Sequence, residues 1–229
     1  MRPSLYLTRA RLRHDPAIAA IAPLLLPVEI SSRTKALHQL IWSLFAGRPD
    51  ATRDFLWQED RQGSLFILSH TPPGESPIFT TETKSLSPNL QAGDRLRFSL
   101  RANATRSLKT DGAARGKRAD VVMAALKSIP PKERAEARPS IIFTEGREWL
   151  KAQGERHGFE LATDAFLRIE SYESLSIPRP GTKPIQISVL SFEGVLNVND
   201  PETFLAALAK GFGHAKAFGC GLMLIQRAA

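Results

Sequence analysis

Residues 211–221 read Gly-Phe-Gly-His-Ala-Lys-Ala-Phe-Gly-Cys-Gly, with four glycines in eleven residues. This glycine run follows a segment of helical pattern and precedes the apolar stretch 222–225, which is typical of a strand. Dinucleotide-binding glycine loops have the opposite order, because they follow a strand and open a helix. The order found here argues against a Rossmann-type fold. Glycine has no Cβ, so the run allows close approach of a ligand, and Lys216 within it suits a phosphate.

The predicted elements of the two halves of the chain begin in the same order. The N-terminal half is predicted as strand, helix, strand, strand, and the C-terminal half as strand, helix, strand, strand, helix, strand. The predicted strands are 4–12, 54–59, 64–70, 94–102, 159–170, 187–198 and 222–225; the predicted helices are 34–45, 119–129, 145–157 and 201–210. This order predicts an α+β fold of tandem ferredoxin-like (RRM-like) domains with antiparallel sheets, at 1–90 and 91–229.

Three connecting segments complete the prediction. Residues 13–32 are expected to form a loop with at most one helical turn, and Ser32 or Thr34 is expected to cap the following helix. Residues 103–118 are basic and carry few large apolar groups, so we expect them to be disordered without a partner. Residues 172–186 combine proline, glycine and basic residues, which is typical of a hairpin tip or loop.

The composition indicates an anionic partner. The chain of 229 residues has a net charge of +8, and its 42% hydrophobic residues suffice for a folded core. Such a charge favours nucleic acid first and a membrane surface second, against the alternative of a generally basic surface. The single cysteine excludes an internal disulfide and fits a reducing cytoplasm. No apolar stretch is long enough for a transmembrane helix, so we expect a cytoplasmic protein without a membrane partner.

The five histidines show no spacing typical of a metal site, and no HExxH motif is present. We therefore predict neither a metal nor a cofactor. His38 is the strongest catalytic candidate, because it lies about 100° from the centre of the apolar stripe of the predicted helix 34–45. Lys35 and Trp42 lie beside it, three residues before and four after. The alternatives are a structural histidine and a solvated lysine; His214 in the glycine run is the competing histidine.

These residues suit the cleavage of RNA. The ribose 2′-OH is an internal nucleophile, so a base, an acid and a cation near the phosphate are sufficient. Histidine suits either proton transfer near neutral pH. A lysine or backbone N–H groups can stabilise the charge that develops on the phosphate. A basic protein with these groups is therefore able to act as a metal-independent ribonuclease.

Several segments resemble the CasE family, the CRISPR repeat endoribonuclease of the type I-E Cascade complex. They occur in the order of the family and span nearly the whole chain. They are Leu37–Leu40, Arg48–Leu56, Leu96–Asn103 (Leu-Arg-Phe-Ser-Leu-Arg-Ala-Asn), Ser191–Leu196 (Ser-Phe-Glu-Gly-Val-Leu) and the glycine run.

The resemblance implies a tandem ferredoxin-like fold and cleavage of precursor CRISPR RNA at the 3′ base of the repeat stem-loop. It implies attack by the 2′-OH without metal, giving a 2′,3′-cyclic (or 3′) phosphate and a 5′-OH. The enzyme is then expected to stay on the RNA and join other Cascade subunits. His38 matches the catalytic histidine of the family. Two departures concern Lys35, where a tyrosine is common, and His214, where a proline is common.

We accordingly assign His38 and Lys35 to catalysis and a larger set of residues to RNA binding. The RNA-binding set is Arg101, Arg106, Lys109, Arg115, Lys117, Arg118, Arg179, Lys183, Gly211, Gly213, His214, Lys216, Gly219 and Gly221. The basic side chains are expected to contact phosphate, because the deep groove of A-form RNA is narrow. The alternative for each is a solvated charge. The alternative function is a weak or inactive crRNA-binding scaffold subunit of the same fold.

Overall fold

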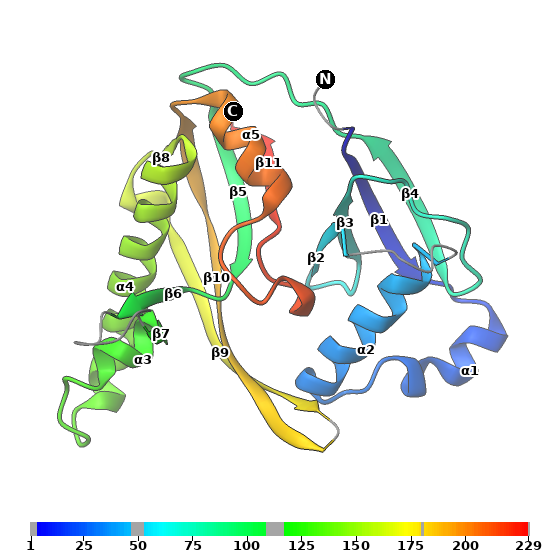
Figure 1. The fold of residues 1–229 in the computed structure, drawn as a ribbon, viewed down its shortest axis with the longest axis horizontal. Helices are drawn as coiled ribbons and strands as arrows, with labels where there is room; N and C mark the ends of the chain where they lie inside the picture. Colours follow the sequence, from blue (N-terminus) through cyan, green and yellow to red (C-terminus); the bar gives the residue numbers. More distant parts are fainter. Residues whose placement is uncertain (1–3, 47–52, 109–116, 180, 229) are drawn as a thin grey trace. The chain divides into compact units, whose positions relative to one another are not determined.

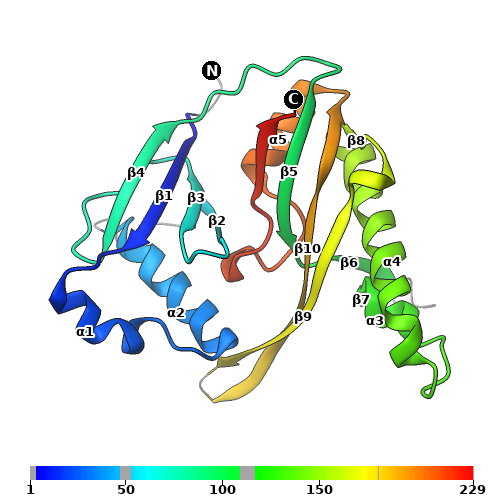
Figure 2. The same ribbon diagram turned by 180° about the vertical axis from the view of Figure 1, so that it is seen from behind.

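A computed structural model of the chain describes residues 4–46, 53–108, 117–179 and 181–228 (Figures 1 and 2). The strands are β1 (Tyr6–Leu12), β2 (Phe55–Glu59), β3 (Leu65–Ser69), β4 (Phe79–Ser85), β5 (Arg95–Ala102), β6 (Thr105–Leu108), β7 (Lys117–Asp120), β8 (Phe159–Leu161), β9 (Arg168–Arg179), β10 (Thr182–Val198) and β11 (Met223–Arg227). The α-helices are α1 (Pro16–Leu25), α2 (Ile30–Ser43), α3 (Val121–Leu126), α4 (Arg134–His157) and α5 (Pro201–Lys210), and short 3-10 helices are η1 (Asp164–Phe166) and η2 (Lys216–Phe218).

The chain forms two compact units. The first comprises residues 1–89, 175–187 and 215–222, and the second comprises 90–174, 188–214 and 223–229. The tip of the β9–β10 hairpin and the second part of the glycine run therefore belong to the first unit. The expected domains 1–90 and 91–229 stay a prediction.

The first unit is built on an antiparallel sheet with the strand order β2-β3-β1-β4. Leu37 and Ile41 of α2, with Leu44 directly after its end, are buried in a core with Ile67 and other side chains of the sheet. The sequence pattern correctly predicts strands β1, β2 and β3 and helix α2. It predicts no strand at the position of β4. The connection 70–78, between β3 and β4, contains no helix.

Helix α2 begins four residues before its predicted start. Its N-cap is Glu29, whose carboxylate accepts hydrogen bonds from the backbone N–H groups of Ser31 (2.9 Å) and Ser32 (2.6 Å). Hydrogen bonds from Ser32, then from Ser31, lower the pKa of Glu29 to about 2. The expectation of Ser32 or Thr34 as the cap is wrong: Thr34 lies inside the helix and donates to the carbonyl of Ile30 at 2.8 Å.

Helix α1 replaces much of the predicted loop 13–32. Asp15 caps it by accepting from the N–H of Ile18 at 3.0 Å, and Pro16 opens its first turn. None of its residues is buried, and Pro23 lies inside it. Ile18, Ala22 and Leu25 are half-buried, so the helix covers its apolar side only in part.

The second unit contains the sheet β11-β5-β10-β8, with β9 paired to β10. If β5, β8, β10 and β11 are counted as first to fourth, both sheets have the order 2-3-1-4. Helices α3, α4 and α5 contribute buried residues such as Val122, Leu150 and Phe204 to one core with the sheet. The α+β prediction of two ferredoxin-like sheets is confirmed.

Three elements of the second unit differ from the prediction. Helix α4 begins at Arg134 rather than at residue 145 and contains Pro139. The region 159–170 divides into β8, η1 and the start of β9. The ends of the segment 103–118 are ordered, because β6 pairs with β7; backbone hydrogen bonding there needs no apolar side chains.

Candidate active site

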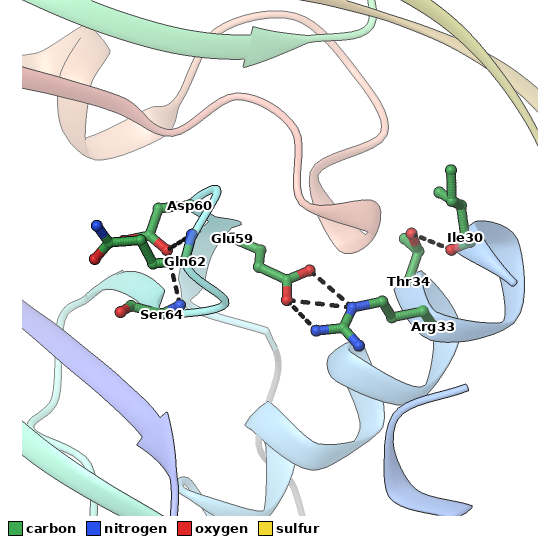
Figure 3. A network of polar contacts seen from close by, with 7 residues as sticks. All are labelled: Ile30, Arg33, Thr34, Glu59, Asp60, Gln62 and Ser64. Carbon is green, nitrogen blue, oxygen red and sulfur yellow. Dashed lines mark hydrogen bonds and ion pairs between the residues drawn. The ribbon is translucent and has the colours of Figure 1, made fainter. Parts of the chain in front are cut away.

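Helix α2 is fixed to the sheet of the first unit by an ion pair (Figure 3). The Nε of Arg33 lies 3.2 Å from both carboxylate oxygens of Glu59, and its Nη2 also contacts Oε1. Glu59 ends β2 and precedes the tight turn that Asp60 closes by accepting from the N–H groups of Gln62 and Ser64. Because the contact is bidentate, it fixes the direction of the helix as well as its distance from β2.

The tip of the β9–β10 hairpin is attached to the start of α2. The backbone N–H of Ser176 donates to the hydroxyl of Ser31 at 3.1 Å, and the side chains of Leu175 and Ile177 are buried. Arg179, beside the exposed Pro178, is exposed on the same tip. The hairpin tip therefore presents its arginine next to the helix that carries His38.

The second part of the glycine run is held by Trp57 of β2. The indole N–H of Trp57 donates to the carbonyl of Ala217 at 3.3 Å. Gly219 has a φ of +73°, and a Cβ added there would lie 3.2 Å from the Trp57 ring. Only glycine meets both demands without strain. Ala215, with a φ of 55°, adopts the left-handed conformation without being glycine.

His38 lies half-buried among aromatic side chains. Its ring centroid is 6.2 Å from that of Phe55 and 6.4 Å from those of Trp42 and Phe218. The indole N–H of Trp42 donates to its Nε2 at 3.3 Å. Burial, and then the positive charge of Arg53, lowers the pKa of His38. The imidazole is therefore neutral over a wider range of pH than an exposed histidine.

His38 opens into a cavity of about 510 Å³ that lies within the first unit. Its lining combines polar and cationic groups with apolar ones. The polar lining is Lys35, His38, Gln39, Arg179 and Thr182; the apolar lining is Ile177, Pro178, Ile185 and Phe218. The cavity thus brings together three predicted site residues, Lys35, His38 and Arg179. They come from two segments about 140 residues apart in the chain.

The other predicted cations have different surroundings. Lys183 is exposed on the hairpin tip and Lys216 is half-buried on η2, and neither lines the cavity. Arg101 pairs with Glu173 at 2.9 Å and Arg106 with Glu145 at 3.0 Å, both in the second unit. Arg118 is exposed on β7. Lys109, Arg115 and the side chain of Lys117 lie outside the described residues.

The glycine run is divided between the units. Gly211 ends α5 with a φ of 77°, Gly213 has a φ of 69°, and His214 forms an isolated β-bridge with Asn103 in the second unit. Residues 215–222, with Lys216, Gly219 and Gly221, belong to the first unit. A Cβ at Gly213 would lie 3.0 Å from the carbonyl oxygen of Asn103, so packing also requires this glycine.

A larger cavity of about 700 Å³ lies in the second unit, between α4, β8 and the start of α5. It contains none of the predicted site residues. Its lining mixes both signs of charge, and Arg147 already pairs with Asp164 at 2.7 Å. We assign the chemistry to the smaller cavity because it holds the half-buried histidine.

Within the described part of the chain, no group of three or more histidine, cysteine or acidic side chains is placed to hold a metal ion. None of the helices there is long and apolar enough to cross a membrane.

Sequence reasoning missed two contributors to the site. Arg53 precedes β2 and acts on His38 by its charge, and Phe218 packs beside the imidazole from the glycine run. Arg53 occurs in the segment 48–56 that carries the family resemblance, which was the available signal. Phe218 is far from His38 in the sequence, and only the tertiary fold brings the two side chains together.

Comparison with known proteins places the chain among CRISPR proteins. Residues 5–227 match the family model described as CRISPR associated protein. The chain is 30% identical over 203 residues to the CRISPR system Cascade subunit CasE of Escherichia coli (strain K12), covering 82% of this chain and 88% of that protein. It is 34% identical over 153 residues to the CRISPR-associated endoribonuclease Cse3 of Thermus thermophilus, covering 62% of this chain and 60% of that one.

Solved structures agree with the sequence comparison. The fold is similar to that of the CRISPR endoribonuclease Cse3 bound to a 19-nucleotide RNA, with a TM-score of 0.68 and 25% identity over 97% of this chain and 98% of that chain. With a family model matched along almost its whole length and CasE and Cse3 among its relatives, the chain belongs to the family described as CRISPR associated protein.

Proposed function

We propose that this protein is an endoribonuclease that cleaves precursor CRISPR RNA within the repeat, at the 3′ base of the stem-loop, without a metal ion. The observation that carries the proposal is the cavity of the first unit, which joins a half-buried neutral histidine to two cations, Lys35 and Arg179. The relatives described as an endoribonuclease and as a Cascade subunit support the same activity.

In the proposed reaction the ribose 2′-oxygen attacks the adjacent phosphorus, and the bond from phosphorus to the 5′-oxygen breaks. The 2′-OH loses its proton and the leaving 5′-oxygen gains one, and His38 performs one of these transfers. Lys35 stabilises the charge that builds on the phosphate oxygens, and Arg179 binds a phosphate of the RNA. The products carry a 2′,3′-cyclic (or 3′) phosphate and a 5′-OH.

RNA binding is assigned to surfaces around this cavity and in the second unit. Residues 215–222, with Lys216, hold the RNA backbone, and the hairpin tip contributes Arg179 and Lys183. After cleavage the protein remains on the mature crRNA and joins the other Cascade subunits, which would make it a soluble component of the cytoplasm.

The test compares the wild type with His38→Ala on labelled repeat RNA in EDTA. We expect the wild type to cleave, and the variant to be slower by about 10²–10⁴-fold with unchanged RNA affinity. Cleavage that requires Mg²⁺ contradicts the metal-independent mechanism, and an unimpaired variant contradicts the role of His38. A wild type that binds tightly but gives no product supports the scaffold alternative instead.

A further inference from the structure

Trp42 lies one helical turn after His38 on α2 and contacts its imidazole directly. The indole Nε1 donates to Nε2 of His38 at 3.3 Å, with the two ring planes 74° apart. An indole N–H only donates, so Nε2 is the acceptor and carries no proton. Because a neutral imidazole holds one proton, that proton lies on Nδ1.

The indole is held in place by its own packing. Its ring meets that of Phe55 edge-on at a centroid distance of 5.3 Å, and it packs against the core of the first unit. Phe55 in turn stacks on Phe45 at 5.1 Å. The direction of the Trp42 N–H is therefore set by the sheet and the helix together, independently of the imidazole.

The protonated histidine is incompatible with this hydrogen bond. Both nitrogens of an imidazolium donate, so the Nε2–H would point at the indole N–H and the bond would be lost. A hydrogen bond made only by the neutral form of a group stabilises that form.

We infer that Trp42 is a positioning residue that keeps His38 neutral, in the tautomer protonated at Nδ1, with its Nε2 lone pair fixed in direction. Its consequence for cleavage, which rests on the proposed function, is that His38 enters the reaction as the base: its Nε2 exchanges the indole N–H for the 2′-OH and takes the proton of that hydroxyl. The tautomer itself rests only on the contact between the two side chains.

Other groups around His38 also affect the protonation of its imidazole. The positive charge of Arg53, before β2, disfavours the imidazolium, as burial does. Lys35 on α2 and Arg179 on the hairpin tip are further cations, and they line the same cavity. They remain in place when Trp42 is replaced, so the contribution of the indole N–H can be separated from theirs.

The test is an NMR titration of ¹⁵N-labelled imidazoles in the free protein, with His38 assigned through His38→Gln. Trp42→Phe keeps an aromatic ring but removes the N–H. We expect the pKa of His38 to rise by about 0.5–1 unit in this variant and its preference for the Nδ1–H tautomer to be lost. The matched control is Trp149→Phe, which removes an indole N–H in the second unit, where the ring stacks on Phe192; it should leave the pKa of His38 unchanged.

The inference is overturned if the wild type is protonated at Nε2, or if Trp42→Phe changes neither the tautomer nor the pKa. Should Trp42→Phe not fold, benzothienylalanine at position 42 gives the same readout, because sulfur replaces the N–H in a ring of similar shape. The titration uses no RNA, so a protein that does not cleave still tests it. In a cleaving protein, the acid limb of the pH–rate profile should move upward with the pKa, whereas a merely structural role would lower the rate without moving that limb.

Discussion

His38 and His214 are both candidates for RNA chemistry, and their surroundings differ. His38 is half-buried among three aromatic rings in the first unit and lines a cavity with Lys35 and Arg179. His214 is exposed in the second unit, where its backbone bridges to Asn103. The protonation of an imidazole depends on the groups around it, such as an indole or a cation. Those groups are brought there by the fold, so the residue type alone does not reveal them.

The largest expected effect tests this comparison directly. His38→Ala should reduce the single-turnover rate of repeat cleavage by about 10²–10⁴-fold, because a proton-transfer group is lost. His214→Ala should stay within a few-fold of the wild type. The measurement is gel-resolved cleavage of end-labelled RNA at saturating protein. The reverse order of the two effects would assign the proton transfer to His214.

The next effect compares a lysine that lines the cavity with a lysine that does not. Lys35 lines it, whereas Lys183 is exposed on the hairpin tip outside it. Lys35→Ala should lower the rate at saturating RNA by about 100-fold, because it removes one group that stabilises the charged phosphate. Lys183→Ala should leave that rate unchanged and weaken binding only. Equal effects of the two variants on the saturated rate would contradict a catalytic role for Lys35.

A smaller effect is expected where the glycine run meets Trp57. Gly219→Ala should lower the free energy of unfolding by roughly 2 kcal/mol, since it combines a left-handed backbone with a tight contact to the indole. The matched control is Gly181→Ala, which also has a positive φ, of +65°, but has nothing within 4 Å of the added Cβ. Urea unfolding measures both, and an equal loss would show that the contact with Trp57 contributes nothing.

Arg179 gives a still smaller effect, on binding. Arg179→Ala should reduce the slope of log affinity against log salt by about 0.7–0.9, the value for one lost phosphate contact. Fluorescence anisotropy over a range of salt concentrations measures the slope. An unchanged slope would mean that Arg179 lines the cavity without touching phosphate.

The smallest effect concerns the start of α2. The pKa of Glu29 is lowered in the folded protein to about 2 from an ordinary 4.5, so its carboxylate stabilises the fold above pH 4.5 and loses this effect as the pH falls towards 2. Glu29→Gln should therefore lower the melting temperature slightly at pH 6, and the gap should close on acidification. A gap that widens at low pH would contradict the cap.

Two Asp-Pro sequences, each at the start of a helix, show how much of the fold can be predicted. Asp200-Pro201 was recognised as the start of α5, which has an apolar side for the core. Asp15-Pro16 starts α1 in the same way, yet the sequence analysis predicts a loop there. No residue of α1 is buried. The capping signal is present in both, but α1 contains an internal proline, Pro23, whereas α5 has only the proline of its first turn.

The candidate site was predictable in its parts and not in its assembly. The position of His38 at the edge of the apolar stripe, with Lys35 and Trp42 beside it, follows from helical geometry. The contacts of α2 with the hairpin tip and with Phe218 depend on tertiary folding, which a single sequence does not specify. The ion pairs of Arg101 and Arg106 with glutamates more than thirty residues away escaped prediction for the same reason.

The attachment of distant segments to α2 and β2 also determines when the site forms. The Ser31–Ser176 contact joins residues 145 apart, and the Trp57–Ala217 contact joins residues 160 apart. Contacts between such distant residues form late in folding, because the loop entropy must be overcome first. Residues 175–187 and 215–222 are also synthesised after the strands of the first sheet. A nascent chain can therefore fold its first sheet before it has a cavity, and the site is complete only once both later segments have joined that sheet.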